Sequence, residues 1–134
     1  MTQLRISVAA GLLGVSDDTV RRLIDAGELP ADRDAAGRMT VDGAQLAAYA
    51  RRRAAVPAAI PVLASSARNR FVGLVTDVVS DPVMSQVELQ CGPYRVVALM
   101  STEAVRDLAL EPGAIGAAVI KATNVIVEVE RIQA

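Results

Sequence analysis

The sequence has no histidine and a single cysteine, and these shortages remove several kinds of site. One cysteine, Cys91, cannot form a disulfide within the chain, and without histidine there is no zinc site of the Cys/His type. Because Cys91 lies in a stretch of alternating apolar residues, we interpret it as a buried structural thiol rather than a reactive one. We also find no paired carboxylates with an evident role and no nucleophile beside a base, so we do not expect an enzyme.

Long apolar runs are absent as well. No stretch of 18 apolar residues occurs, which argues against a membrane-spanning helix, and the first residues do not resemble a signal peptide. We therefore expect a cytoplasmic protein without a membrane partner. The pattern G-x-x-x-x-G-K-[ST] is also missing, so the chain lacks the phosphate-cradling loop of transporter ATPases.

A strong positive charge is missing too, since the formal net charge is -1. Residues 1–53 carry eight arginines and seven acidic residues, whereas residues 65–134 carry five arginines, one lysine and eight acidic residues. The front is weakly positive and the back weakly negative. Any contact with nucleic acid must therefore come from a local cluster rather than from a global basic field.

A change of composition divides the chain of 134 residues. Residues 54–64, AAVPAAIPVLA, contain two prolines and no charge, and we interpret them as a linker between a domain over residues 1–53 and a domain over residues 65–134. A domain of about 60 residues buries only about 60% of its unfolded surface and is marginal alone. Each half is therefore expected to gain stability from a partner such as a second copy of the chain.

The first half has helical spacing of its apolar residues. The pattern predicts a helix over residues 8–13 capped by Ser7, a tight turn over residues 14–16, and a second helix over residues 17–26 that Gly27 ends. A loop-rich stretch follows, with a hairpin tip at residues 34–37. Asp42 is expected to cap a last helix that runs to about Arg53, with Leu46 and Tyr49 facing inward.

Two short helices joined by a turn with a glycine form the helix-turn-helix pattern, whose second helix enters the major groove of DNA. The residues at the start of that helix are Ser16, Asp17, Asp18, Thr19, Arg21 and Arg22. Arginine reads guanine with two parallel hydrogen bonds, and serine or threonine holds phosphates. The aspartates either cap the helix or accept from cytosine. The alternative is that Arg21 and Arg22 are only a solvated helix face.

The stretch GVSDDTVRRLIDAGELP, with its surroundings over residues 4–53, resembles the winged helix-turn-helix of excisionase and MerR-like proteins. This resemblance implies double-stranded DNA as a partner, and it places Arg33 and Arg38 in a wing that contacts the backbone or the minor groove. The implied DNA-binding set is Ser16, Asp18, Thr19, Arg21, Arg22, Arg33 and Arg38.

After the linker the period of the apolar residues changes from that of a helix to that of a strand. Strands are predicted over residues 71–79, 83–91, 94–100, 114–120 and 125–130, with a hairpin turn at Gly92-Pro93 and one short helix over residues 102–108. Five strands and one helix within about 65 residues suggest a small closed or half-closed barrel.

Hydrogen-bond donors gather at three ends of these predicted elements, namely SSARNR over residues 65–70, Ser101-Thr102, and KATN over residues 121–124. Free backbone N–H groups, hydroxyls and cations suit a tetrahedral oxyanion, which acceptor-only groups would repel. Taken singly, each group has a plainer interpretation: an exposed lysine, the end of a linker, or a helix cap.

The motifs SARN, over residues 66–69, and IKATNV, over residues 120–125, resemble the molbindin (Mop, or TOBE) domain, and the similarity extends over residues 65–131. The resemblance implies an OB-like five-stranded barrel that associates through its strands and binds molybdate or tungstate between subunits, with no metal cation. The implied oxyanion-binding residues are Ser66, Ala67, Arg68, Ser101, Lys121, Ala122 and Thr123. The sequence departs from the family at Ala104, where a serine is common, and at Ala109, where the family has glycine.

Together these patterns predict an α+β chain of two domains: an N-terminal winged helix-turn-helix, mainly α, and a C-terminal OB-like five-stranded β-barrel with one short helix. The leading hypothesis is a transcriptional regulator that senses molybdate or tungstate and forms a homo-oligomer through its Mop domain. One alternative is a molybdate storage or buffering protein whose first domain serves assembly. Another is a carbohydrate or sulfate role for the TOBE-type domain.

Overall fold

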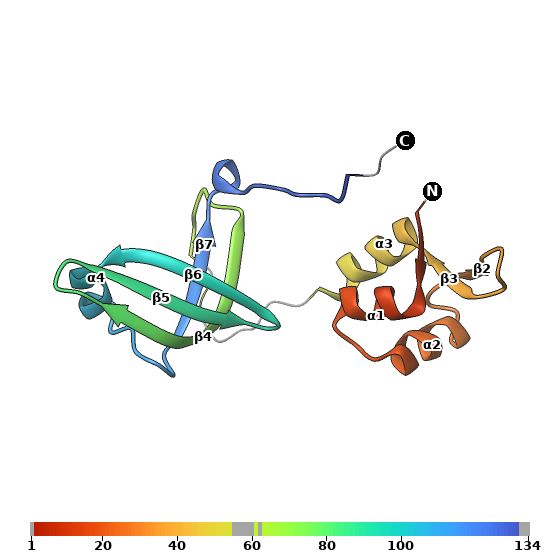
Figure 1. Ribbon diagram of the computed structural model, residues 1–134, viewed down its shortest axis with the longest axis horizontal. Helices are drawn as coiled ribbons and strands as arrows, with labels where there is room; N and C mark the ends of the chain where they lie inside the picture. Colours follow the sequence, from red (N-terminus) through yellow and green to blue (C-terminus); the bar gives the residue numbers. More distant parts are fainter. Residues whose placement is uncertain (1, 55–60, 62, 132–134) are drawn as a thin grey trace. The chain divides into compact units, whose positions relative to one another are not determined.

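The computed structural model describes residues 2–54, 61 and 63–131. The chain divides into two compact units, Met1–Ala55 and Val56–Ala134, which we describe separately (Figure 1). Most of the linker predicted over residues 54–64 lies outside the described residues.

The N-terminal unit combines three helices with a small sheet. Its elements in chain order are β1 (Gln3–Arg5), α1 (Ile6–Leu13), α2 (Asp17–Asp25), β2 (Ala31–Arg33), β3 (Met39–Asp42) and α3 (Gly43–Arg53). The strands pair antiparallel in the order β1-β3-β2. The three helices and the hairpin tip are confirmed, whereas β1 had no signal in the sequence.

The helices of this unit converge on one core because their apolar residues repeat at helical spacing. The buried residues are Ile6, Ala9, Ala10, Val20, Leu29, Val41 and Leu46. Tyr49 packs against this core from α3, as its spacing predicted. Asp42 caps α3 as predicted, since its carboxylate accepts a hydrogen bond from the backbone N–H of Gln45.

The predicted cap of α1 is wrong. The helix begins at Ile6, so Ser7 lies inside its first turn, and Arg5 occupies the N-cap position without a capping side chain. The reason is that β1 pairs with β3 up to Arg5, whose backbone is still extended (φ -69°, ψ 155°) when the helix starts. Gly14 ends α1 in the left-handed conformation, with φ 69°.

The C-terminal unit is built on one long strand. Its elements are β4 (Asn69–Ser80), β5 (Met84–Cys91), β6 (Tyr94–Ser101), α4 (Thr102–Asp107), β7 (Ile115–Ile120) and the 3₁₀ helix η1 (Ala122–Asn124). The sheet is antiparallel in the order β6-β5-β4-β7. The first half of β4 pairs with β7 and the second half with β5, and the register shifts between Val75 and Asp77.

Gly73 permits the close approach of strands at this point of β4. A Cβ atom at Gly73 would lie 2.4 Å from the carbonyl oxygen of Gln90 and 2.7 Å from Sγ of Cys91, distances that real Cβ atoms do not tolerate. Cys91 itself is buried with Val75, Val87, Leu89 and Val105. Burial raises the pKa of its thiol, in agreement with a structural role.

The fifth strand predicted over residues 125–130 is not formed. Within the described part of the unit the sheet has four strands, and the chain leaves it after η1 (Figure 1). Ile126, Val127 and Val129 are 87%, 80% and 85% exposed. A strand requires a neighbouring edge for its backbone N–H and C=O groups, and no described element of this unit pairs with the segment.

Ala109 occupies a backbone position that suits glycine better than alanine. It is the only described non-glycine residue with a positive φ, 52°, and it follows the C-cap of α4, where its N–H donates to the carbonyl of Arg106. An L-residue in this region carries a steric cost that glycine does not.

We therefore expect Ala109→Gly to raise the free energy of unfolding by about 0.5–1 kcal/mol, the relief of strain being partly offset by the greater freedom of glycine in the unfolded chain. Urea denaturation of the full chain measures the change. Gly113→Ala is the matched control in the opposite direction, because Gly113 has φ 96° and an alanine there introduces strain. A loss of stability in Ala109→Gly would contradict this account.

Candidate nucleic-acid interface and oxyanion site

The start of α2 is held by a serine cap. Oγ of Ser16 accepts a hydrogen bond from the backbone N–H of Thr19 at 3.2 Å and lies 3.0 Å from Oγ1 of the same residue. Asp18 forms an exposed ion pair with Arg21 at 3.5 Å, and Arg22 is exposed next to it. The structure thus gives Ser16 and Thr19 a role in helix capping and leaves the arginines on the surface.

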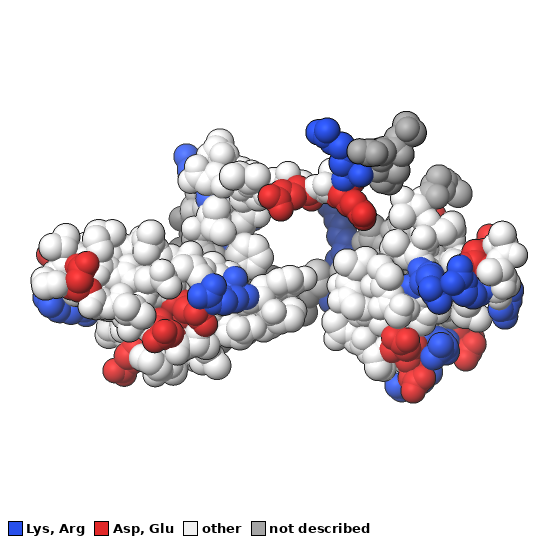
Figure 2. Space-filling view, viewed as in Figure 1, with Lys and Arg blue, Asp and Glu red and all other residues white. Residues whose placement is uncertain are grey.

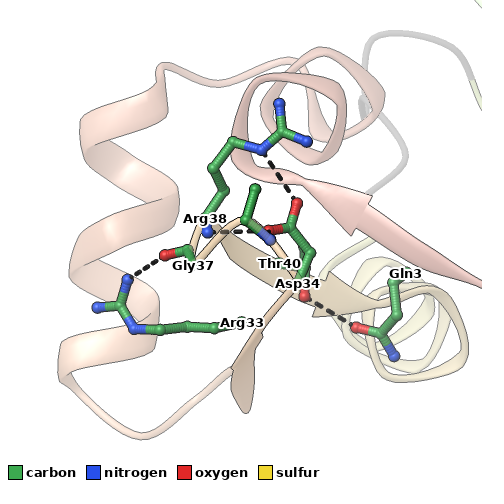
Figure 3. A network of polar contacts seen from close by, with 7 residues as sticks. Gln3, Arg33, Asp34, Gly37, Arg38 and Thr40 are labelled. Atoms are coloured by element: carbon green, nitrogen blue, oxygen red, sulfur yellow. Dashed lines mark hydrogen bonds and ion pairs between the residues drawn. The ribbon is translucent and has the colours of Figure 1, made fainter.

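The β2–β3 hairpin holds its two arginines in fixed positions (Figure 3). Nη1 of Arg33 donates to the carbonyl of Gly37 at 2.8 Å, and Nε of Arg38 lies 3.1 Å from Oδ2 of Asp34. The other carboxylate oxygen of Asp34 accepts the backbone N–H groups of Ala36 and Arg38, each at 2.9 Å. Figure 3 shows the two guanidinium groups on different sides of the turn.

These bonds keep Asp34 ionised. The hydrogen bond from the backbone N–H of Arg38 is the largest influence and holds the pKa of the Asp34 carboxyl below its ordinary value; the N–H of Ala36 and the Arg38 guanidinium act in the same direction. The hairpin tip is therefore organised before any ligand arrives.

The predicted DNA-binding residues do not form one cluster. Arg21 and Arg38 line a common groove of about 360 Å³ beside the start of α2, whereas Arg22 and Arg33 are not among its lining residues. Figure 2 shows basic and acidic side chains next to each other on this unit, so its positive charge is local. Arg5 also lines the groove, and sequence reasoning missed it because β1 was not predicted.

Two of the three predicted oxyanion-binding segments meet at one end of the sheet. Asn69 pairs with Ile120, and Nδ2 of Asn69 donates to the carbonyl of Ile120 at 3.1 Å. Because Arg68 precedes Asn69 and Lys121 follows Ile120, the two cationic residues flank the same pair of strand ends. Both are exposed, as are Ser66 and Thr123.

Each of these segments forms a turn, and the second leaves backbone N–H groups without a side-chain partner. Oγ of Ser65 accepts the N–H of Ala67 at 3.1 Å, and Nη1 of Arg68 donates to the carbonyl of Ser65 at 3.3 Å. On the other side, Lys121 is the N-cap residue of η1 and no side chain caps it, so the N–H groups of Ala122 and Thr123 begin the helix without a side-chain partner.

The third segment lies at the other end of the sheet. Ser101 pairs with Met84 of β5, and the next residue of β5, Ser85, pairs with Ser80, the last residue of β4. Asn69 is the first residue of β4 and Ser80 the last, so Ser101 and Lys121 lie at opposite ends of this strand, whose length along the chain is about 36 Å at about 3.3 Å per residue. Figure 1 likewise shows α4 and η1 at opposite ends of this unit. Oγ of Ser101 accepts the N–H of Ala104 at 3.1 Å as the cap of α4.

Two other kinds of feature are absent from the described part of the chain. No helix in it is long and apolar enough to cross a membrane. No group of three or more Cys, Asp or Glu side chains in it is arranged to hold a metal ion.

Comparison with known families accounts for both units. A helix-turn-helix domain model matches residues 4–54, and the TOBE domain model matches residues 65–127. The chain is a helix-turn-helix domain joined to a TOBE (Mop) domain. Neither is an enzymatic kind of domain. None of the curated proteins is similar enough to the chain to be matched.

Solved structures resemble the TOBE half. A molybdate-binding protein from Sporomusa ovata is 30% identical, with 49% of this chain and 98% of that protein aligned and a TM-score of 0.48. MopII from Clostridium pasteurianum is also 30% identical, over 49% of this chain and all of its own (100%), with a TM-score of 0.46. The cytoplasmic molybdate-binding protein ModG, solved with molybdate bound, is 38% identical over 48% of this chain, which spans only 46% of ModG, with a TM-score of 0.46.

We expect the carboxyl of Asp34 to titrate below the ordinary value of an aspartate when followed by carbon-detected NMR. In Arg38→Ala most of this depression should persist, because the backbone N–H of residue 38 remains and is the largest cause. Since the folded pKa is lowered, the hairpin gains stability from ionised Asp34 above the unfolded pKa and loses it as pH falls through the folded value. A return of Asp34 to its ordinary pKa in Arg38→Ala would show that the ion pair dominates instead.

Proposed function

We propose that this protein is a DNA-binding transcriptional regulator that senses molybdate or tungstate at sites assembled from two copies of its TOBE domain. The observation that carries the proposal is the fusion, in one chain, of a helix-turn-helix domain with a TOBE domain whose oxyanion donors lie at both ends of the sheet.

The strand ends at Asn69 and Ile120 supply the chemistry that a tetrahedral dianion needs. Arg68 and Lys121 bring two cations, and the hydroxyl of Ser66 and the N–H groups of Ala122 and Thr123 bring further donors. No acidic residue occurs in residues 65–70 or 121–124, so no acceptor-only group opposes the anion. The similar protein from Sporomusa ovata and ModG both bind molybdate, and we extend that ligand class, with tungstate as its isostere, to this chain. The anion needs no metal cation here.

Ser101 requires a second copy in this scheme, because within one chain it lies a strand length away from Lys121. Exposed apolar side chains favour such an association: Leu99, Ile115 and Val119 are 72%, 56% and 53% exposed, and the visible face of this unit in Figure 2 is mostly uncharged. The unpaired apolar segment after η1 would then form the fifth strand against the sheet of a partner copy and complete the OB-like barrel.

The N-terminal unit would supply the DNA contacts, with α2 as the recognition helix and the β2–β3 hairpin as the wing. Association through the TOBE domains brings two such units together, and helix-turn-helix dimers bind half-sites about 34 Å apart. An anion bound between copies changes the relative stability of their arrangements, and the resulting change in spacing alters the affinity for an operator.

Variants of the anion site test the proposed binding of molybdate. Calorimetric titration of the full chain with molybdate should show affinity about 10- to 100-fold lower in Lys121→Ala and in Arg68→Ala, since each removes a charge-assisted hydrogen bond. Tungstate should bind like molybdate and sulfate weakly. Unchanged affinity in both variants would contradict the assignment, and preference for sulfate would favour another role for the TOBE domain.

Substitution of Ser101 tests whether the third segment takes part. Ser101→Asp retains a good N-cap for α4 but directs a negative charge at the anion, so it should fold and lose molybdate binding. Ser101→Thr is the control and should retain both properties. Because Ser101 and Lys121 come from different copies, mixing and refolding Ser101→Asp with Lys121→Ala should restore some sites. Normal binding by Ser101→Asp alone would show that Ser101 lies outside the site.

Selection of duplexes from a random DNA library tests the proposed sequence-specific binding of DNA. The wild type should enrich a two-fold symmetric sequence, and its affinity for that sequence should change with molybdate. Arg22→Ala should weaken binding to the selected sequence by about 1–3 kcal/mol while molybdate binding is kept. Failure to enrich any sequence, with or without molybdate, would favour storage or buffering with a first domain used for assembly.

A further inference from the structure

The groove beside α2 collects arginines from three separate elements. Arg5 comes from the end of β1, Arg21 from α2, and Arg38 from the residue before β3. Ser7, in the first turn of α1, and Asp17, the first residue of α2, complete its polar lining. The groove measures about 360 Å³, and all five side chains are exposed, so it is open to a large ligand.

The pleat of the sheet directs two of these arginines to the same side. Arg5 pairs with Thr40, and Arg38 lies two residues before Thr40 along the same strand direction. Side chains alternate along a strand, so Arg5 shares the face of Thr40, and Arg38, directly before β3, lines the same groove as Arg5. Leu4 and Val41, which are also paired, turn to the opposite face and pack in the core. Both guanidinium groups are therefore held outside the core by the register of β1 and β3.

Arg5 differs from its two neighbours in having no carboxylate partner. Arg21 is paired with Asp18 and Arg38 with Asp34, but no hydrogen bond or ion pair of the Arg5 side chain occurs among the described residues. The helix that follows Arg5 has no capping side chain, so the first N–H groups of α1 lack a side-chain acceptor. A guanidinium beside a hydroxyl and an uncapped helix start is a donor set suited to phosphate.

We propose that this groove holds a backbone phosphate of double-stranded DNA, with Arg5 as a contact residue that anchors the N-terminal unit beside its recognition helix. The proposal deepens the proposed function and rests on it. Phosphate contacts fix the register and orientation of a protein on a duplex, and the groove adjoins the end of α2 that would enter the major groove. An open, exposed groove suits a phosphate delivered by a polymer, because a free ion there remains screened by salt and water.

The test measures binding of the full chain to a mixed-sequence duplex of about two helical turns, by fluorescence anisotropy at several salt concentrations. Non-specific binding comes from phosphate contacts, so no operator is needed. Arg5→Ala should bind several-fold more weakly at low salt, and the slope of log K against log salt should fall in magnitude by about 0.9, the value of one phosphate contact. Arg5→Lys, which retains the charge, should recover most of the slope.

Two further variants distinguish an effect of the groove on DNA binding from an effect of the protein's net charge. Arg106→Ala, on α4 of the other unit, removes the same charge and should leave the slope unchanged. Asp17→Asn removes the one acidic side chain that lines the groove, and it should strengthen binding and steepen the slope. Melting curves of each variant verify that the N-terminal unit remains folded.

The outcomes are distinct. If the wild type binds no duplex at low salt, both the proposed function and the groove assignment are wrong. If the wild type binds the duplex but Arg5→Ala retains the full salt slope, the groove assignment alone is wrong. The same holds if Arg106→Ala loses as much of the slope as Arg5→Ala. Saturable binding of inorganic phosphate to the wild type, abolished by Arg5→Ala, would identify the groove as a free-anion site and overturn the DNA assignment.

Discussion

The C-terminal unit depends on the division of one strand between two neighbours. The first half of β4 pairs with β7 and its second half pairs with β5. This double pairing requires the glycine at position 73, because Gln90 and Cys91 leave no room for a Cβ atom there. The same pairing decides where the donor-rich segments go. It places the SARN turn beside Lys121, and it sends Ser101 to the far end of the sheet. A hairpin sheet with short strands would not separate these segments in this way.

In the N-terminal unit, polar side chains fix the ends of short helices and strands around a small apolar core. Ser16 and Asp42 cap two helices, and Asp34 closes the hairpin turn through backbone N–H groups and Arg38. These bonds are local and exposed, so each contributes modestly to stability. Their greater effect is on geometry, because they restrict the orientations of the arginines that stand on the same turns.

Sequence reasoning located most elements because their signals are local. The glycine turn between α1 and α2, the Asp42 cap and the alternation in β5 and β6 each depend on neighbouring residues. It failed where distant pairing decides the outcome. β1 has three residues and exists only because β3 lies beside it, and its pairing moved the start of α1 ahead of Ser7. The segment after η1 has the alternation of a strand but pairs with no described strand of its unit. For the same reason the sequence could name candidate oxyanion donors but could not reveal that one chain separates them.

The exposed apolar segment after η1 has a consequence for how such a sensor would respond inside a cell. If its strand forms only against another copy, then folding of this part and assembly of the anion site are one equilibrium, and that equilibrium depends on the amount of protein as well as on the anion. Under the proposed function, at low abundance more molybdate would be needed to complete the same fraction of sites. Under the proposed function, the protein's own concentration would thereby become a second input, and a gene that it controlled would register both.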